Sequence, residues 1–205
     1  MTTKERIVEE ALTLFSVKGF KGTSVKNIAD AVGIRDSSLY KHFKSKKEIF
    51  DTIVSKVGER IQKMSTEFGI PSDDNFDELV QYYGDLTEAE LQELSKKIFL
   101  FYLEDDFISR FWCMANMEQY QNPEIYEIFR KIFMEDSIHY QSKLFAEMIK
   151  KGFFIDVAPD VMAMNFYAPI FFLLSKYNGR KKEREEALAI LEQQMAEFYR
   201  IYRRK

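Results

Sequence analysis

The chain contains 205 residues, which is enough for one or two domains with a hydrophobic core. Its 8 glycines and 4 prolines favour a helical protein over a turn-rich β fold, and its single cysteine excludes an internal disulfide framework. The two histidines leave no metal cluster of the usual spacing, so we expect neither a metal nor a cofactor. A formal net charge of −3 argues against a nucleic-acid partner for the chain as a whole.

The N-terminal segment contains Glu5, Glu9 and Glu10 among its apolar positions, which is typical of neither a signal peptide nor a transit peptide. The longest uncharged run, residues 161–175, is shorter than the roughly 20 apolar residues that a membrane-spanning helix needs. We therefore expect a cytoplasmic protein without membrane contact, in which this run forms a buried helix.

The N-terminal region is expected to hold three helices. Thr2 and Glu5 form a capping box at the start of the first. The helices are predicted over residues 3–18, from an N-cap at Thr23 or Ser24 to Gly33, and between Ile34 and Phe43.

A second capping box, Ser45 and Glu48, begins a long helix that runs to about Met64. The same start and stop signals predict helices after Asn75 and after Thr87, two helices within 91–121 that meet near 104–106, and helices over 123–151, from Pro159 to Asn178 and over 183–202. No strand pattern is found, so we predict an all-α fold with about nine helices.

The charges are unevenly spread along the chain. Residues 1–48 hold ten Lys or Arg and six Asp or Glu, a net +4, so the remaining residues carry −7. A surplus of this size usually marks a solvated face. Here, however, it accompanies two short helices around the Gly33 turn, packed beneath a preceding helix, which is the pattern of a helix-turn-helix DNA-binding module. The second short helix must enter a major groove about 12 Å wide, and its outer side chains Ser37, Ser38, Tyr40 and Lys41 can offer hydrogen bonds there.

Four stretches, residues 19–24, 28–34, 39–43 and 45–49, resemble the N-terminal region of the TetR family of transcriptional regulators, whose pattern covers about residues 4–52. The resemblance implies a three-helix DNA-binding domain over residues 1–48 and a helical ligand-binding and dimerisation domain over residues 49–205. Beyond about residue 60 it implies helices, a dimer and a pocket, but no particular ligand.

The resemblance also implies two groups of DNA contacts. Those expected to hold the phosphate backbone are Thr23, Ser24, Tyr40, His42 and Lys46. Those expected to read bases are Arg35, Asp36, Ser37, Ser38 and Lys41, with Arg35 able to fork onto a guanine. Arg35 and Ser37 depart from the family pattern, which often has Ser or Thr and Gly at these places, so the operator sequence is not implied.

Aromatic residues are abundant, with 19 Phe, 11 Tyr and 1 Trp, and 19 of these 31 lie between Phe99 and Tyr177. Bulky rings can leave apolar cavities, although a ring stripe at helical spacing is more often core. Because the resemblance implies a pocket, we expect one near Trp112, lined by Phe99, Tyr102, Trp112, Tyr120, Phe129, Phe133 and Phe166. Cys113 is interpreted as a buried structural thiol, and Glu104 to Asp106 as a solvated helix junction.

The last two helices carry a dimerisation signal. The helix from Asp160 is apolar nearly all round, and the final helix shows an apolar seam at spacings of three and four. The predicted homodimer interface comprises Val161, Ala168, Phe172, Leu188, Leu191, Met195, Phe198 and Tyr202. The alternative is that these residues pack within one chain.

Together these features predict a homodimeric, ligand-responsive transcriptional regulator that binds a palindromic operator in double-stranded DNA. A repressor is favoured because occlusion of a promoter needs no further contact surface. A small hydrophobic or aromatic effector would release the DNA by tilting the long helix over residues 45–64. One alternative is a ligand-independent regulator controlled by a protein partner. The other is a small-molecule enzyme, for which we find no nucleophile and base set, so we predict that the chain is not an enzyme.

Overall fold

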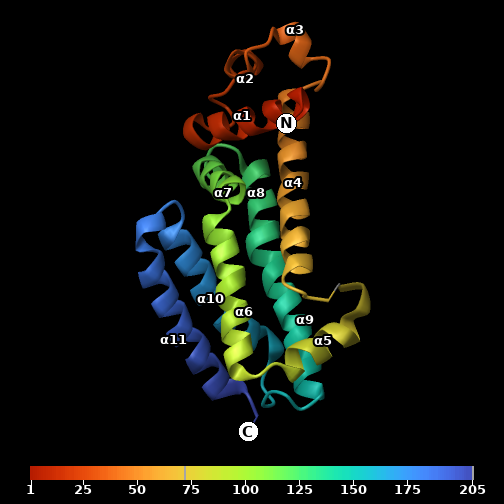
Figure 1. The fold of residues 1–205 in the computed structure, drawn as a ribbon, viewed down its shortest axis with the longest axis vertical. Helices are drawn as coiled ribbons and strands as arrows, with labels where there is room; N and C mark the ends of the chain where they lie inside the picture. The colour runs from red at the N-terminus through yellow and green to blue at the C-terminus, as the bar shows by residue number, and fades with distance from the viewer. Residues whose placement is uncertain (72, 205) are drawn as a thin grey trace. The chain divides into compact units, whose positions relative to one another are not determined.

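The computed structural model describes residues 1–71 and 73–204 (Figure 1). The described residues form α-helices with short 3-10 and π segments, and their only β pairing is an isolated bridge between Phe154 and Arg203. The predicted all-α class is therefore confirmed. No helix in this part of the chain combines the length and apolarity that crossing a membrane requires.

The chain divides into two compact units. Unit 1 comprises Met1–Gln62 and Asp106–Phe129, and unit 2 comprises Lys63–Asp105 and Arg130–Lys205. The predicted DNA-binding segment, residues 1–48, thus shares its unit with a segment that lies far downstream in the sequence.

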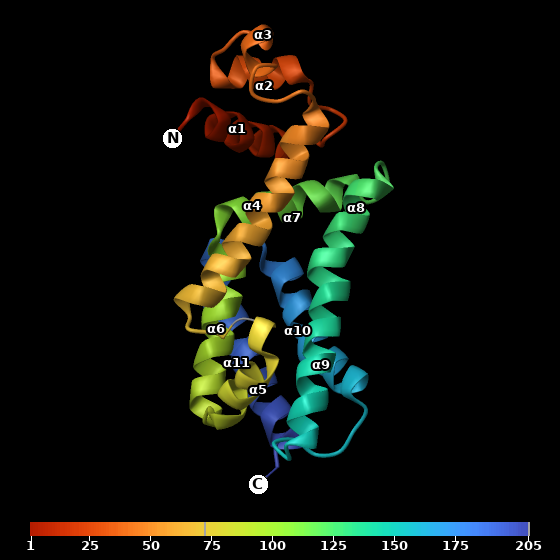
Figure 2. The same ribbon diagram turned by 90° about the vertical axis from the view of Figure 1, so that its right-hand side faces the viewer.

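Unit 1 is built around its first helix, which packs against both α2 and α7, while α2 also packs against α3 (Figures 1 and 2). Its helices are α1 (Thr3–Lys18), α2 (Val25–Val32), α3 (Asp36–Leu39), most of α4 (Lys46–Glu67), α7 (Asp106–Glu118) and α8 (Pro123–Arg130). Its core includes Ile7, Leu12, Phe15, Ile28, Leu39, Phe50 and Phe111.

Local signals explain where the first helices begin and end. The Thr2 hydroxyl accepts from the Glu5 N–H, and the Glu5 carboxylate accepts from the Thr2 N–H, a hydrogen bond that lowers the pKa of Glu5. Of the two predicted caps for α2, Ser24 is the one used. Gly33 ends α2 in the left-handed region at φ +75°, which glycine adopts without steric cost.

Unit 2 is a bundle in which α10 contacts α6, α9 and α11, α11 also contacts α6, and α5 contacts α9. Its helices are α5 (Phe76–Asp85), α6 (Glu88–Glu104), α9 (Asp136–Lys150), α10 (Pro159–Tyr177) and α11 (Arg184–Tyr202), with 3-10 turns at Asp73–Asn75 and Lys181–Glu183. Asn75 and Thr87 cap α5 and α6 as predicted. The junction expected near residues 104–106 is also confirmed, because α6 ends at Glu104 and α7 begins at Asp106.

One predicted helix differs from its observed form. The pattern expected over residues 123–151 is divided by a π segment at Lys131–Glu135, between α8 and α9. A single wide turn shifts the helical face without breaking the chain of hydrogen bonds, so apolar periodicity does not reveal it.

The structure corrects the role predicted for the seam of α11. Leu188, Leu191, Met195 and Phe198 are buried within the single chain. The Phe198 ring lies 5.0 Å from the ring of Phe166 on α10 and 5.5 Å from that of Phe145 on α9, measured between centroids. These four side chains therefore belong to the core of unit 2, since a 3-4 spacing marks a buried face without saying which chain covers it.

Candidate nucleic-acid interface

The segment from Arg35 to Phe43 combines an anchored face with an exposed polar face. Leu39 and Phe43 are buried, so they fix α3 and the turn after it to the core of unit 1. The exposed residues are Arg35, Asp36, Ser37, Tyr40, Lys41 and His42, while Ser38 is half-buried. Seven of the ten predicted DNA-contact residues are therefore carried by this one segment, and six of them are exposed.

The remaining three, Thr23, Ser24 and Lys46, surround the turn between α1 and α2, and the side chain of each binds protein atoms. Thr23 is fully buried, and its hydroxyl donates to the Gly19 carbonyl at 2.9 Å. Ser24 is exposed, and its hydroxyl accepts from the Asn27 N–H at 3.1 Å and donates to the Asn27 side-chain oxygen at 2.8 Å. The Thr23 hydroxyl thus holds the turn, and the Ser24 hydroxyl caps α2.

Lys46, the third of these residues, binds the same turn from the start of α4. Its Nζ donates to the Phe20 carbonyl at 2.6 Å and to the Thr23 carbonyl at 2.8 Å, and it lies 4.2 Å from the centre of the Phe20 ring. Burial lowers the pKa of Lys46, while the negative charge of Glu118 partly opposes this shift. Two of its three N–H donors are used on the protein, which leaves one for a phosphate.

Glu118, at the end of α7, is a member of this site that the sequence did not reveal. Its side chain is 2% exposed, and its Oε1 accepts from the Phe20 N–H at 2.8 Å across 98 residues of sequence. The sequence signal that could have revealed this residue is its position, because Glu118 continues the apolar face of α7 formed by Phe111, Met114 and Ala115. Burying an acidic side chain costs free energy unless the side chain is paired or hydrogen-bonded, so a partner is expected.

Helix α7 is also tied to α1 at its other end. The Arg110 guanidinium donates to the Glu9 carboxylate at 2.8 Å, to the Glu9 carbonyl at 3.2 Å and to the Thr13 hydroxyl at 2.9 Å. A second link joins α4 to α8, where Lys47 forms an ion pair with Glu124 at 3.1 Å. The helix-turn-helix segment is therefore attached to the downstream part of unit 1 through several side chains.

The residues predicted to line a ligand pocket are divided between the two units. Trp112, Tyr120 and Phe129 belong to unit 1, whereas Phe99, Tyr102, Phe133 and Phe166 belong to unit 2. Trp112 and Phe129 form a buried edge-to-face pair at 4.9 Å between ring centroids, and Tyr120 is 89% exposed in the turn after α7. Cys113 is exposed rather than buried, which corrects its interpretation as a core thiol.

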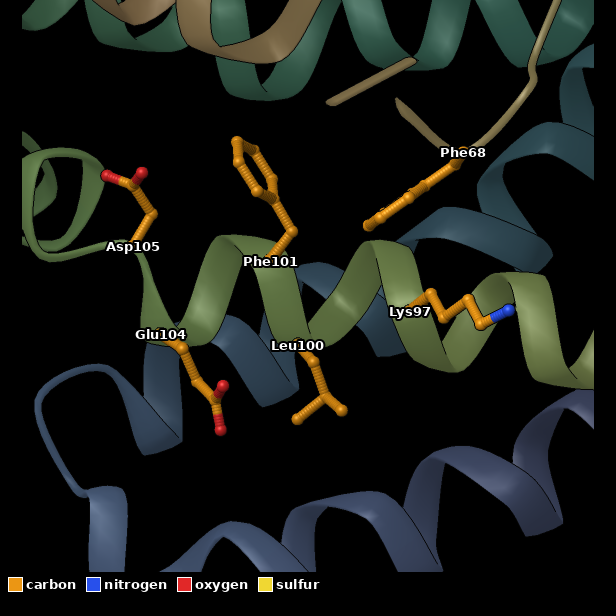
Figure 3. Close-up of a pocket in the computed structure, with 6 residues that line it drawn as sticks. All are labelled: Phe68, Lys97, Leu100, Phe101, Glu104 and Asp105. Carbon is orange, nitrogen blue, oxygen red and sulfur yellow. The ribbon is translucent and has the colours of Figure 1, made fainter. Parts of the chain in front are cut away.

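A cavity of about 430 Å³ opens in unit 2 along α6. It is lined by Phe68, Lys97, Leu100, Phe101, Glu104 and Asp105 (Figure 3). The rings of Phe68 and Phe101 lie on the same side of α6, while Leu100 and Glu104 point to another side. Glu104 accepts from Arg184 at 2.8 Å, so its charge is already paired. None of the seven predicted pocket residues lines this cavity.

Four predicted dimer residues remain besides the four buried ones of α11. Three of them lie on α10, and the fourth, Tyr202, is the last residue of α11. Val161, Ala168 and Phe172 are exposed, and Phe172 is 63% exposed despite its size. Tyr202 is half-buried, and its hydroxyl accepts from the side-chain amide of Asn165 at 2.7 Å.

Comparison with known proteins identifies relatives of the N-terminal region. Residues 7–53 match the family described as bacterial regulatory proteins, tetR family. Over 123 residues the chain is 29% identical to the biofilm operon icaADBC HTH-type negative transcriptional regulator IcaR of Staphylococcus aureus (strain Newman). That alignment covers 60% of this chain and 59% of the relative, so it spans less than two thirds of the relative's length.

Solved structures resemble the whole chain in fold. The SmeT–triclosan complex matches with a TM-score of 0.72 at 15% identity, covering 100% of this chain and 93% of that one. A TetR family transcriptional regulator from Chloroflexus aurantiacus matches with a TM-score of 0.69 at 18% identity, covering 99% and 94%. At these identities the likeness establishes the fold alone.

Proposed function

Because residues 7–53 match the tetR family of bacterial regulatory proteins, we propose that the chain is a transcriptional repressor of this family that binds operator DNA through α3 and the turn after it. The observation that carries this proposal is the exposed polar face from Arg35 to His42, held in place by the buried Leu39 and Phe43. Repression is favoured over activation because the similar S. aureus protein is named a negative transcriptional regulator. Such a protein acts in the cytoplasm, where its DNA lies.

The ten predicted contact residues have two kinds of role in this proposal. The exposed residues from Arg35 to His42 approach base edges and phosphates directly. Thr23 and Lys46 act mainly on the backbone of the turn before α2, and Ser24 acts on the first turn of α2 itself. The amide end of α2 then faces the phosphate backbone with its geometry fixed.

A homodimer is the assembly that we propose. Apolar side chains Val161, Met164, Ala168 and Phe172 are exposed along α10 at spacings of three and four residues. A large exposed apolar stripe is typical of a protein interface. A two-fold dimer would place its recognition helices about one turn of DNA apart, roughly 34 Å, and would therefore read a palindrome.

The cavity on α6 is the proposed effector site. Its volume and its two phenylalanine rings suit a small hydrophobic or aromatic molecule. The similar fold that was solved with triclosan supports this choice of ligand class. Phe68 lies one residue beyond α4, whose first residue is Lys46, so a ligand that moves Phe68 acts on a helix that also belongs to the DNA-binding unit.

Selection of bound DNA from a random pool tests the function directly. The full-length protein should enrich a palindromic sequence, and failure to enrich any sequence at low salt would overturn the proposal. Small aromatic compounds, triclosan among them, are then screened for release of that DNA. We expect an effector to weaken binding by about 5- to 150-fold, and Phe101→Ala to remove this response. If the effector releases operator DNA from Phe101→Ala as readily as from the wild type, the effector site lies elsewhere.

A further inference from the structure

Glu118 is a buried acid whose role is not explained by helix packing. Its Oε1 accepts from the Phe20 N–H, but its Oε2 is buried and has no hydrogen-bond partner among the residues that the structure describes. A buried carboxylate oxygen without a partner costs free energy, and such groups are rare in proteins. An apolar residue here would pack on the same face of α7 without this cost.

The turn that Glu118 contacts is held from two sides. The acid binds the N–H of Phe20 from α7, while the Lys46 ammonium binds the carbonyls of Phe20 and Thr23 from α4. Burial lowers the pKa of Lys46, and the negative charge of Glu118 partly offsets this shift, so the acid favours the charged form of Lys46.

The position of Gly19 reflects the same contact. A Cβ at this residue would lie 2.6 Å from the Glu118 Oε1, which is closer than real Cβ atoms approach. The backbone of Gly19 also adopts φ +74°, a value that favours glycine. A side chain at this position would therefore displace the Glu118 carboxylate from its place against the turn.

We propose that Glu118 is a positioning residue for operator binding, which fixes the turn from Gly19 to Thr23 and through it the start of α2. This inference rests on the proposed function. The turn ends at Ser24, the N-cap of α2, and α2 leads through Gly33 to α3. Because Glu118 is buried, it acts on DNA recognition only through the backbone that it holds.

Two substitutions and one control separate the possible roles of this side chain. Glu118→Ala removes both the acceptor and the charge. Glu118→Gln keeps an acceptor for the Phe20 N–H and removes the charge beside Lys46. Glu124→Gln is the control, because it is also an acid-to-amide change at a contact with α4, but its side chain is largely exposed and its ion pair should contribute little.

The experiment measures binding to the selected palindrome and to an unrelated duplex, with full-length proteins well below their unfolding temperatures. We expect Glu118→Ala to lose about tenfold or more in operator affinity, with little change on unrelated DNA. Hydrogen exchange at the Phe20 amide should accelerate in Glu118→Ala and stay slow in Glu118→Gln. Glu118→Gln should lose a few-fold in affinity, and Glu124→Gln should match the wild type.

Folded Glu118→Ala that binds the palindrome as tightly as the wild type would overturn the inference while leaving the proposed function intact. An equal loss on both DNAs would assign Glu118 to stability alone and would also overturn it. If Glu118→Ala does not fold, Glu118→Gln decides, because an affinity equal to that of Glu124→Gln contradicts the inference. If the wild type enriches no DNA, the proposed function fails and this inference fails with it.

Discussion

The two compact units bury their polar groups in different ways. In unit 1 the buried side chains of Thr23 and Glu118 and the half-buried Lys46 all bind backbone atoms of one short turn. In unit 2 the half-buried Arg203 also donates to backbone carbonyls, those of Gly84 and Leu86, but several helices additionally carry shielded phenol hydroxyls. Burial raises the pKa of Tyr83, Tyr102 and Tyr167 above their usual values. Unit 1 therefore concentrates three polar side chains on one turn, whereas unit 2 places many of its shielded polar atoms on the aromatic rings of its helices.

This difference predicts how each unit responds to substitution. Changes to the polar groups of unit 1 should affect DNA recognition as well as stability. Changes to the rings of unit 2 should affect stability first, because their hydroxyls and faces fill the core between helices.

The largest expected effect comes from Phe198→Ala in unit 2. The Phe198 ring contacts those of Phe145, Phe154 and Phe166 at centroid distances of 5.0 to 6.1 Å, so its removal leaves a cavity among three elements. We expect the free energy of unfolding to fall by about 3–5 kcal/mol, measured by chemical denaturation.

Phe172→Ala is the matched control, because it removes the same ring from an exposed position on α10. We expect it to weaken self-association in sedimentation while changing the stability of the chain far less. If Phe198→Ala dissociates the dimer without loss of stability, the α11 seam belongs to the dimer interface after all.

Alkaline pH should destabilise unit 2 through its shielded tyrosines. Burial raises the pKa of Tyr199 to about 12, from the usual tyrosine value of 10.0. The folded state therefore keeps a proton that the unfolded state loses, so this contribution is complete below pH 10 and disappears as pH rises to about 12. The loss from Tyr199 is about 2–3 kcal/mol in unfolding free energy. Denaturation measured across this range should be less pH-dependent in Tyr199→Phe, and an unchanged slope would contradict the assignment.

The sequence predicted the helices of unit 1 because the signals that set them are local. Capping boxes and the Gly33 turn act over a few residues, and they fixed α1, α2 and the anchored segment from Arg35 to Phe43. Glu118 was missed because its partner lies 98 residues away. No spacing rule connects the end of α7 to the turn before α2.

In unit 2 the helices were predictable but the partners of their faces were not. The α11 seam has the same periodicity whether a neighbouring helix or a second chain covers it, so its burial in one chain could not be read from spacing. The cavity on α6 was missed because it combines Phe68, beyond the end of α4, with charged residues of α6, and aromatic content alone does not reveal such a combination.

Thr23→Val tests the polar design of unit 1 with a change that preserves shape. The variant removes the hydroxyl that donates to the Gly19 carbonyl inside the protein, leaving that carbonyl without this partner. We expect a loss of about 1–3 kcal/mol in unfolding free energy, together with weaker operator binding at temperatures where the variant stays folded. A drop in stability with unchanged operator affinity would show that the turn does not transmit its geometry to α3.

Lys41→Ala should change stability least, because this side chain is exposed on the turn after α3. We expect a change within about 0.5 kcal/mol in unfolding free energy. Because the variant removes a cation from the proposed DNA surface, the slope of log affinity against log salt concentration should become shallower by about one. Lys143→Ala, an exposed lysine on α9 in unit 2, is the control and should leave the slope unchanged. An equal change in both variants would mean that DNA contacts are not confined to unit 1, and the functional difference between the two units would then not hold.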